Sequence, residues 1–128
     1  MSVRILVADD HFVARHALRT VITQRQDWQV CGEAIDGADA VALAKSLRPD
    51  VVILDLVMKG LNGVDAAQEI GYESPTTILL TTSLYDARPI IPRLQSAGVC
   101  GFVPKSRIGI DLIPAVEAVL KGRTWFRF

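Results

Sequence analysis

The stretch DVVILD, residues 50–55, decides the fold of this chain. Residues 51–54 are apolar at every position rather than at alternate ones, which is typical of a strand buried on both faces in a parallel sheet covered by helices. Asp55 follows where such a strand leaves the core. Because ligands of open α/β sheets bind outside the carboxyl ends of the strands, Asp55 is a candidate functional residue. A carboxylate there also commonly caps a turn, so this stretch alone leaves both roles open.

The composition sets limits on the class of protein. The chain has 128 residues, half of them hydrophobic, and a formal net charge of zero. This length suits one domain with a buried core, and the neutral balance argues against a surface dedicated to nucleic acid. We see no run long enough to span a membrane and no signal-peptide pattern. Cys31 and Cys100 are far apart, which is typical of buried thiols in a reducing compartment, so we expect a cytoplasmic protein.

Strand-like and helix-like segments alternate along the chain. Strands are predicted at residues 3–8, 28–34, 51–55, 77–82 and 100–103. The first helix is predicted at about 11–26, and the second runs from Asp36 as its cap to the residues before Pro49. The third runs from Asn62 to about Ile70, with Gly71 as its stop. The fourth lies near 91–97, and the last ends at Gly122.

This alternation with short connections predicts an α/β fold, in which a doubly wound, five-stranded parallel sheet lies between layers of five helices. The expected strand order is 2-1-3-4-5, the flavodoxin-like arrangement, within one domain over residues 1–128. The order places the first and third strands side by side. Asp9, Asp10 and Asp55 should therefore converge at one edge of the sheet.

The fourth helix is expected to be short or irregular. Residues 84–97 contain Pro89 and Pro92, and proline inside a helix costs about 3 kcal/mol or more, whereas the first turn tolerates it. We therefore predict an extended or single-turn segment over 84–90. The regular helix should begin near Ile91, with Pro92 at its first position, and end at Gly98.

Three carboxylates at one edge repel one another, and either protonation or a bound cation relieves that repulsion. Mg²⁺ prefers carboxylate, carbonyl and water oxygens. We predict that Asp10, Asp55 and the backbone carbonyl of Val57 ligate Mg²⁺, and that Asp9 acts through a water. Taken singly, each carboxylate is more simply explained as a cap of a helix or loop, so the prediction rests on their convergence.

Two further positions suit an anionic phosphoryl group at the same edge. Thr82 and Ser83 end the fourth strand and offer a hydroxyl, and Lys105 ends the fifth strand and offers a cation. Alone, Lys105 would be interpreted as a surface lysine and Thr82 as an ordinary strand residue.

The whole set, taken in order, resembles the response regulator receiver domain of two-component signalling: Asp9, Asp10, Asp55, Gly63, Thr82 or Ser83, Phe102 and Lys105. The phrases ILVADDH, PDVVILDLVMKGLNG, SAGVCGFVPK and IPAVEAVLKGRTWF are most similar to the NarL/FixJ-type branch. This resemblance covers essentially the whole chain.

The resemblance implies a phosphoacceptor rather than an enzyme. Asp55 would take a phosphoryl group from a histidine kinase, the acidic pair would surround Mg²⁺, and Lys105 would contact the phosphoryl group. Thr82 is similar to the switch hydroxyl and Phe102 to the switch aromatic. Their movement would change the surface of the fourth helix, fifth strand and fifth helix and so control an output, transcription in this branch.

The sequence departs from the family at two places: Lys59 replaces the usual proline after the methionine, and Ser106 replaces a proline after Lys105. The register of the switch hydroxyl stays open, because counting back from Lys105 without gaps reaches Ser83, whereas the strand pattern favours Thr82. His11 and His16 are interpreted as surface residues without a ligand role.

Two rival functions remain. An aspartate-nucleophile phosphatase of the haloacid-dehalogenase kind needs a second aspartate two residues after the first, where this chain has Val57. A pseudo-receiver that is never phosphorylated is the other rival. We expect no output domain in this chain, and so no nucleic acid bound by it. Whether it forms a homodimer, and which kinase it meets, stay open.

Overall fold

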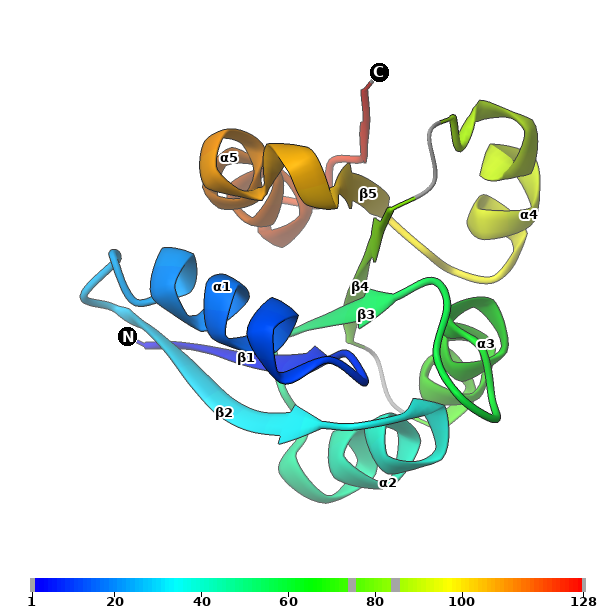
Figure 1. Cartoon of the computed structure of the whole chain (residues 1–128), viewed down its shortest axis with the longest axis horizontal. Coiled ribbons are helices and arrows are strands. Elements are labelled where there is room, and N and C mark those ends of the chain that lie inside the picture. Colours follow the sequence, from blue (N-terminus) through cyan, green and yellow to red (C-terminus); the bar gives the residue numbers. More distant parts are fainter. Residues whose placement is uncertain (1, 74–75, 84–85, 128) are drawn as a thin grey trace.

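The computed structural model describes residues 2–73, 76–83 and 86–127. Their strands form one parallel sheet in the order β2-β1-β3-β4-β5-β6 (Figure 1). The strands are β1 (Val3–Ala8), β2 (Trp28–Ala34), β3 (Val51–Asp55), β4 (Thr77–Thr82), β5 (Gly101–Pro104) and β6 (Trp125–Phe126). The predicted α/β fold and the order of its first five strands are therefore confirmed.

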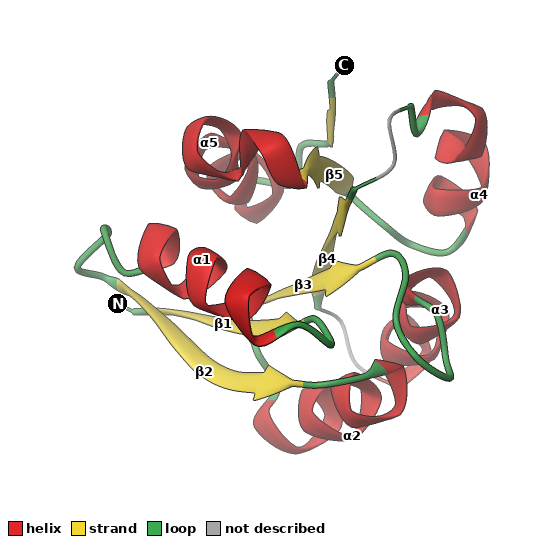
Figure 2. Cartoon of the chain, viewed as in Figure 1, coloured by secondary structure: helices red, strands yellow, loops and turns green. Residues whose placement is uncertain are grey.

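Helices cover both faces of this sheet (Figure 2). They are α1 (Phe12–Ile22), α2 (Gly37–Leu47), α3 (Gly63–Glu73), α4 (Ile91–Ser96) and α5 (Ile108–Leu120), with two single 3-10 turns, η1 (Arg88–Ile90) and η2 (Lys105–Arg107). The first and last helices lie on one face, and α2, α3 and α4 lie on the other. None of the described helices combines the length and the apolar character that crossing a bilayer requires.

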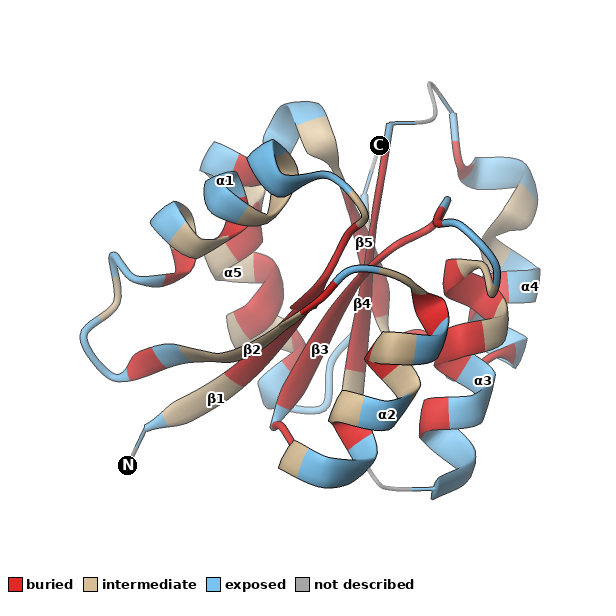
Figure 3. Ribbon diagram, turned by 60° about the horizontal axis from the view of Figure 1, so that its bottom comes forward, coloured by how far each residue is buried: buried red, intermediate tan, exposed pale blue. Residues whose placement is uncertain are grey.

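The central strand β3 is buried along its whole length, as its unbroken apolar run predicts (Figure 3). Its side chains alternate between two cores because successive residues of a strand point to opposite faces. Val52 and Leu54 pack with α2 and α3, whereas Val51 and Ile53 pack with α1 and α5. Asp55 is the last residue of this strand, and the strand before it packs into both cores. This packing fixes the position of the Asp55 carboxylate.

Two helix ends differ from the sequence prediction. The first helix ends at Ile22 rather than near Gln26, because Thr23 caps it and its amide donates to the Arg19 carbonyl at 3.0 Å. The third helix runs through Gly71 to Glu73 instead of stopping at the glycine. A glycine ends a helix when it adopts the left-handed conformation; Gly98 and Gly122 do so after α4 and α5, with φ of 85° and 80°.

The short fourth helix is confirmed over the residues described. It spans six residues, begins at Ile91 with Pro92 in its first turn, and follows the η1 turn. Leu94 is its buried side chain. The part of the prediction that concerns residues 84 and 85 lies outside the described residues.

The sixth strand is an addition that the sequence prediction missed. Trp125 and Phe126 pair with Gly101 and Phe102 of β5. A Cβ at Gly101 would lie 2.5 Å from the carbonyl oxygen of Trp125, so this close pairing requires glycine. Trp125 packs into the α5 core and Phe126 against Phe102 on the opposite face, with ring centroids 6.3 Å apart. The described end of the chain is therefore anchored on both faces of the sheet.

Candidate functional site

Four side chains meet at the carboxyl edge of the sheet. Asp9 and Asp10 follow β1, Asp55 ends β3, and Lys105 follows β5. The β1–β3 register pairs Ala8 with Leu54, so Asp9 and Asp55 emerge from adjacent strands at the same level. The predicted convergence of the three carboxylates and the lysine is observed.

Lys105 connects two of the carboxylates. Its Nζ lies 2.9 Å from Oδ2 of Asp9 and 3.1 Å from Oδ2 of Asp55, and both of these side chains are almost wholly buried. Burial, and then the charge of Asp9, raises the pKa of Asp55 despite the opposing lysine. Burial lowers the pKa of Lys105, but the contacts of its ammonium with the carboxylates of Asp9 and Asp55, and their negative charges, outweigh burial, so this pKa is raised overall.

Carboxylate oxygens of this cluster can still bind a cation. Oδ2 of Asp9 and Oδ1 of Asp10 are buried and make no well-oriented hydrogen bond, although Asp9 is in ion-pair contact with Lys105. Oδ1 of Asp55 accepts a long hydrogen bond of 3.4 Å from the Val57 amide. Hard oxygen ligands with unused lone pairs are what Mg²⁺ requires, so the residues present fit the predicted ion. The Val57 carbonyl as a further ligand stays a prediction.

The loop after Asp55 closes tightly onto it. A Cβ at Gly63 would lie 2.4 Å from the carbonyl oxygen of Asp55, so this helix start can approach the strand only as glycine. Asn62 caps α3 as predicted, because its side-chain oxygen accepts from the Asp65 amide at 3.0 Å. Lys59, at the departure from the family pattern, is exposed.

His11 is a residue whose contacts sequence reasoning missed. Its side chain is 71% exposed, as expected for a surface residue, yet its Nδ1 lies 2.9 Å from Oδ1 of Asp10 and 3.2 Å from Oδ1 of Asp9. Ligand atoms from Asp9, Asp10, His11 and Asp55 all lie within 4.8 Å of one another. The only signal in the sequence was that His11 directly follows the acidic pair. That position does not predict the side-chain rotamer that turns the imidazole towards the carboxylates. His16 is exposed and stacks beside Phe12.

Arg15 was also missed. Its guanidinium donates to the backbone carbonyl of Asp9 at 2.8 Å and to Glu33 at 3.2 Å. It thereby ties the loop that carries the acidic pair to α1 and β2.

The two candidate switch hydroxyls differ in environment. Thr82 ends β4, is 2% exposed and pairs with Pro104. Thr82 points to the same face as Leu80, two positions earlier, and Leu80 is paired with Phe102, so Thr82 lies on the Phe102 face of the sheet. Ser83 is exposed and follows the strand, one position further towards the edge that carries Lys105.

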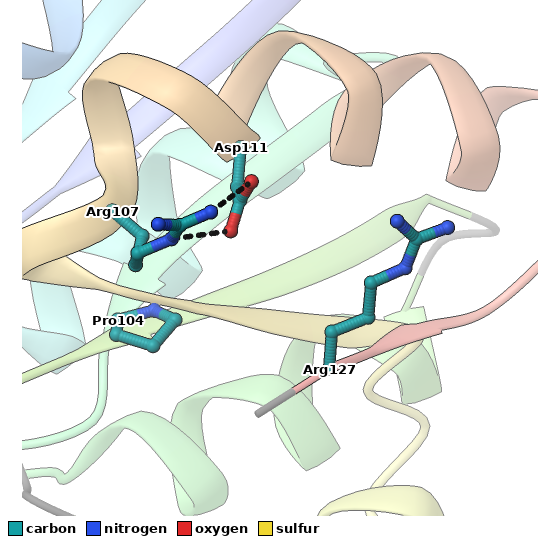
Figure 4. Close-up of a pocket in the computed structure, with 4 residues that line it drawn as sticks. All are labelled: Pro104, Arg107, Asp111 and Arg127. Carbon is teal, nitrogen blue, oxygen red and sulfur yellow. Dashed lines mark hydrogen bonds and ion pairs between the residues drawn. The ribbon is translucent and has the colours of Figure 1, made fainter.

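A pocket of about 380 Å³ is lined by side chains from the end of β5, from η2, from α5 and from the residue after β6 (Figure 4). Its lining residues are Pro104, Arg107, Asp111 and Arg127. Arg107 forms two hydrogen bonds to Asp111, of 3.1 and 3.3 Å. Of the two guanidinium groups that line the pocket, that of Arg107 is therefore already paired.

The chain matches the model of the response regulator receiver domain over residues 5–117. It therefore belongs to the response regulator receiver family.

Its relatives include transcriptional regulators. It is 36% identical over 121 residues to the transcriptional regulatory protein LiaR of Bacillus subtilis, covering 94% of this chain and 57% of LiaR. It is 30% identical over 127 residues to the response regulator VraR of Staphylococcus aureus, covering 98% of this chain and 60% of VraR. The chain thus spans less than two thirds of the length of these curated relatives.

Solved structures agree with this assignment. The signal receiver domain of the response regulator NarL from Mycobacterium tuberculosis superposes with a TM-score of 0.88 at 35% identity, covering 95% of this chain and 98% of that one. A LuxR-family response regulator from an Aurantimonas species gives a TM-score of 0.90 at 32% identity, covering 98% and 89%.

Proposed function

We propose that this chain accepts a phosphoryl group on Asp55 from a histidine kinase, in a reaction that depends on Mg²⁺. The observation that carries the proposal is the contact of one Lys105 ammonium with both Asp9 and Asp55 at the edge of the sheet. A buried acceptor carboxylate, an acidic neighbour and a cation within reach are the groups that phosphoryl transfer needs.

The chemistry at Asp55 is an in-line displacement. One carboxylate oxygen attacks phosphorus, the P–N bond to the kinase histidine breaks, and the nitrogen keeps the bonding pair. Asp10, Asp55 and the Val57 carbonyl would hold the ion, with Asp9 acting through a water. When bound, Mg²⁺ supplies positive charge to the phosphoryl oxygens. Lys105 starts 3.1 Å from Asp55, so it needs little movement to follow the charge from carboxylate to phosphoryl oxygen.

The response would begin with a hydroxyl at the end of β4 and with Phe102. Phosphorylation adds about one to two negative charges and new acceptor oxygens beside Asp55. The exposed Ser83 lies nearer the edge of the sheet, whereas Thr82 shares the face of Phe102. Movement of either residue would alter the packing of Phe102, and with it the surface of α4, β5 and α5.

The output would be transcription, as the names of the relatives suggest. Because those relatives are considerably longer, the effector function would be a property of a longer protein. The rival reading, a pseudo-receiver, predicts the same fold with no phosphorylation.

The proposal is tested with a small-molecule phosphodonor, followed by intact mass. The wild-type chain should gain the mass of one phosphoryl group with Mg²⁺ and should gain none when a chelator removes the ion. An unchanged mass under both conditions would favour the pseudo-receiver. A gain that is indifferent to the chelator would refute the Mg²⁺ dependence.

A further inference from the structure

The imidazole of His11 rests against the acidic pair although most of its surface is open to solvent. Its Nδ1 lies 2.9 Å from Oδ1 of Asp10 and 3.2 Å from Oδ1 of Asp9. Its backbone amide also donates to Oδ1 of Asp9 at 2.9 Å. The main chain and the ring of His11 are thus both directed to the carboxylates.

These separations suit ligands around a single ion. In an octahedral complex with bonds of about 2.1 Å, adjacent ligand atoms lie about 3 Å apart and opposite ones about 4.2 Å. The two nitrogen–oxygen distances match the adjacent spacing. All ligand atoms of the four residues lie within 4.8 Å of one another, so the widest pair would close by up to about 0.6 Å to reach the opposite spacing.

The oxygen nearest the imidazole has no well-oriented hydrogen bond. Oδ1 of Asp10 is buried and lacks such a partner despite its 2.9 Å approach to His11. Oδ2 of Asp9 also lacks a well-oriented hydrogen bond, but it is in ion-pair contact with Nζ of Lys105 at 2.9 Å. In the neutral tautomer that carries its proton on Nε2, the lone pair of Nδ1 faces the lone pairs of the carboxylate, and a cation between them would satisfy both.

We infer that His11 is an additional ligand of this site and gives it affinity for borderline transition ions. Imidazole nitrogen suits Co²⁺, Ni²⁺ and Zn²⁺, whereas carboxylate, carbonyl and water oxygens suit Mg²⁺. The same pocket would therefore bind Co²⁺ through His11 and the aspartates, in competition with Mg²⁺. The inference rests on the proposed metal site and adds to it a ligand that changes which ions bind.

The experiment compares the wild-type chain with His11→Ala, and with His16→Ala as the matched control. His16 is the other histidine of the chain and is exposed on α1. Calorimetric titrations measure the affinities for Co²⁺ and Mg²⁺ separately, and Mg²⁺ is then used to displace Co²⁺. The Co²⁺-loaded proteins are also examined by NMR for a paramagnetically shifted imidazole resonance.

His11→Ala should weaken Co²⁺ binding by about tenfold or more, leave Mg²⁺ affinity within about twofold, and remove the shifted resonance. His16→Ala should change none of these. Equal Co²⁺ affinity in wild type and His11→Ala would overturn the inference and leave the imidazole as a hydrogen-bonding group, with the Mg²⁺ site intact. An apparent Co²⁺ affinity that added Mg²⁺ leaves unchanged would also overturn it, because Co²⁺ would then occupy a separate site. Absence of binding by either ion would instead refute the proposed metal site.

Discussion

Nζ of Lys105 lies 3.1 Å from Oδ2 of Asp55, although fifty positions separate the two residues in the chain. The contact exists because β4 lies between the strands that carry them and all three strands end at the same edge. The lysine offsets part of the negative charge of Asp55 and Asp9 in a site that burial makes unfavourable for carboxylates. It therefore stabilises the fold and prepares the acceptor at the same time.

Replacing Lys105 by alanine should reveal both effects. Without metal, two nearly buried carboxylates would lose their cation, so the free energy of unfolding should fall by about 1–3 kcal/mol. Phosphorylation by a small-molecule donor should also slow. Lys59→Ala, which removes an exposed lysine from the loop after Asp55, is the control. Urea unfolding and timed mass spectra provide the measurements. Equal losses in the two variants would contradict a specific role for Lys105.

The raised pKa of Asp55 predicts a pH dependence for the metal-free protein. The folded state holds the Asp55 proton more tightly than the unfolded state, because burial and then Asp9 disfavour the charge. This contribution to stability is therefore complete below the ordinary pKa of about 3.8 and is lost as pH rises through the raised value.

The asparagine in Asp55→Asn does not ionise, so the variant does not lose this stability as the pH rises. It should be more stable than wild type at neutral pH, and the difference should shrink as the pH approaches the ordinary pKa of the carboxyl. Urea midpoints measured with a chelator present across this range provide the test. A wild type that equals or exceeds the variant at neutral pH would contradict the stated electrostatics.

The two hydroxyls at the end of β4 should behave differently. Ser83 is exposed, so Ser83→Ala should change the stability of the unphosphorylated chain by less than about 0.5 kcal/mol. Thr82 is buried, so Thr82→Ala should destabilise it by about 1–2 kcal/mol. Hydrogen exchange of α4 and β5 before and after phosphorylation identifies the switch. The residue whose loss abolishes the change is the switch hydroxyl; a change preserved in both variants would exclude both.

The docking of β6 depends on one glycine. Gly101→Ala would place a Cβ 2.5 Å from the backbone oxygen of Trp125, so β6 should separate from β5 and tryptophan emission should shift to the red. Gly109 of α5 is the control, because a Cβ there meets nothing within 4 Å, and alanine should stabilise the helix by up to about 1 kcal/mol. An unshifted spectrum in Gly101→Ala would show that β6 tolerates the side chain.

The fold could be predicted because its decisive signals are local. An unbroken apolar run placed β3 in the centre, and Pro89 with Pro92 shortened α4 to six residues. The meeting of Asp9, Asp55 and Lys105 followed from the strand order, because each residue ends or directly follows a strand. Sequence pattern therefore predicts which residues share an edge of the sheet.

What the sequence could not predict depends on contacts between distant segments. The two residues of β6 form a strand only because Gly101 lets them approach β5. Gly71 resembles a helix stop, but it carries no positive φ and α3 continues through it. The direction of the His11 ring depends on its side-chain rotamer, and the hydrophobic periodicity of the sequence does not predict rotamers.

Intact mass of the wild type and of Asp55→Asn, after incubation with a phosphodonor and Mg²⁺, tests the central claim most directly. Asp65→Asn, which alters a carboxylate of α3 outside the cluster, is the control. The wild type and the control should gain the mass of one phosphoryl group, and Asp55→Asn should gain none. A phosphoryl gain that persists in Asp55→Asn would contradict the assignment of Asp55 as the acceptor.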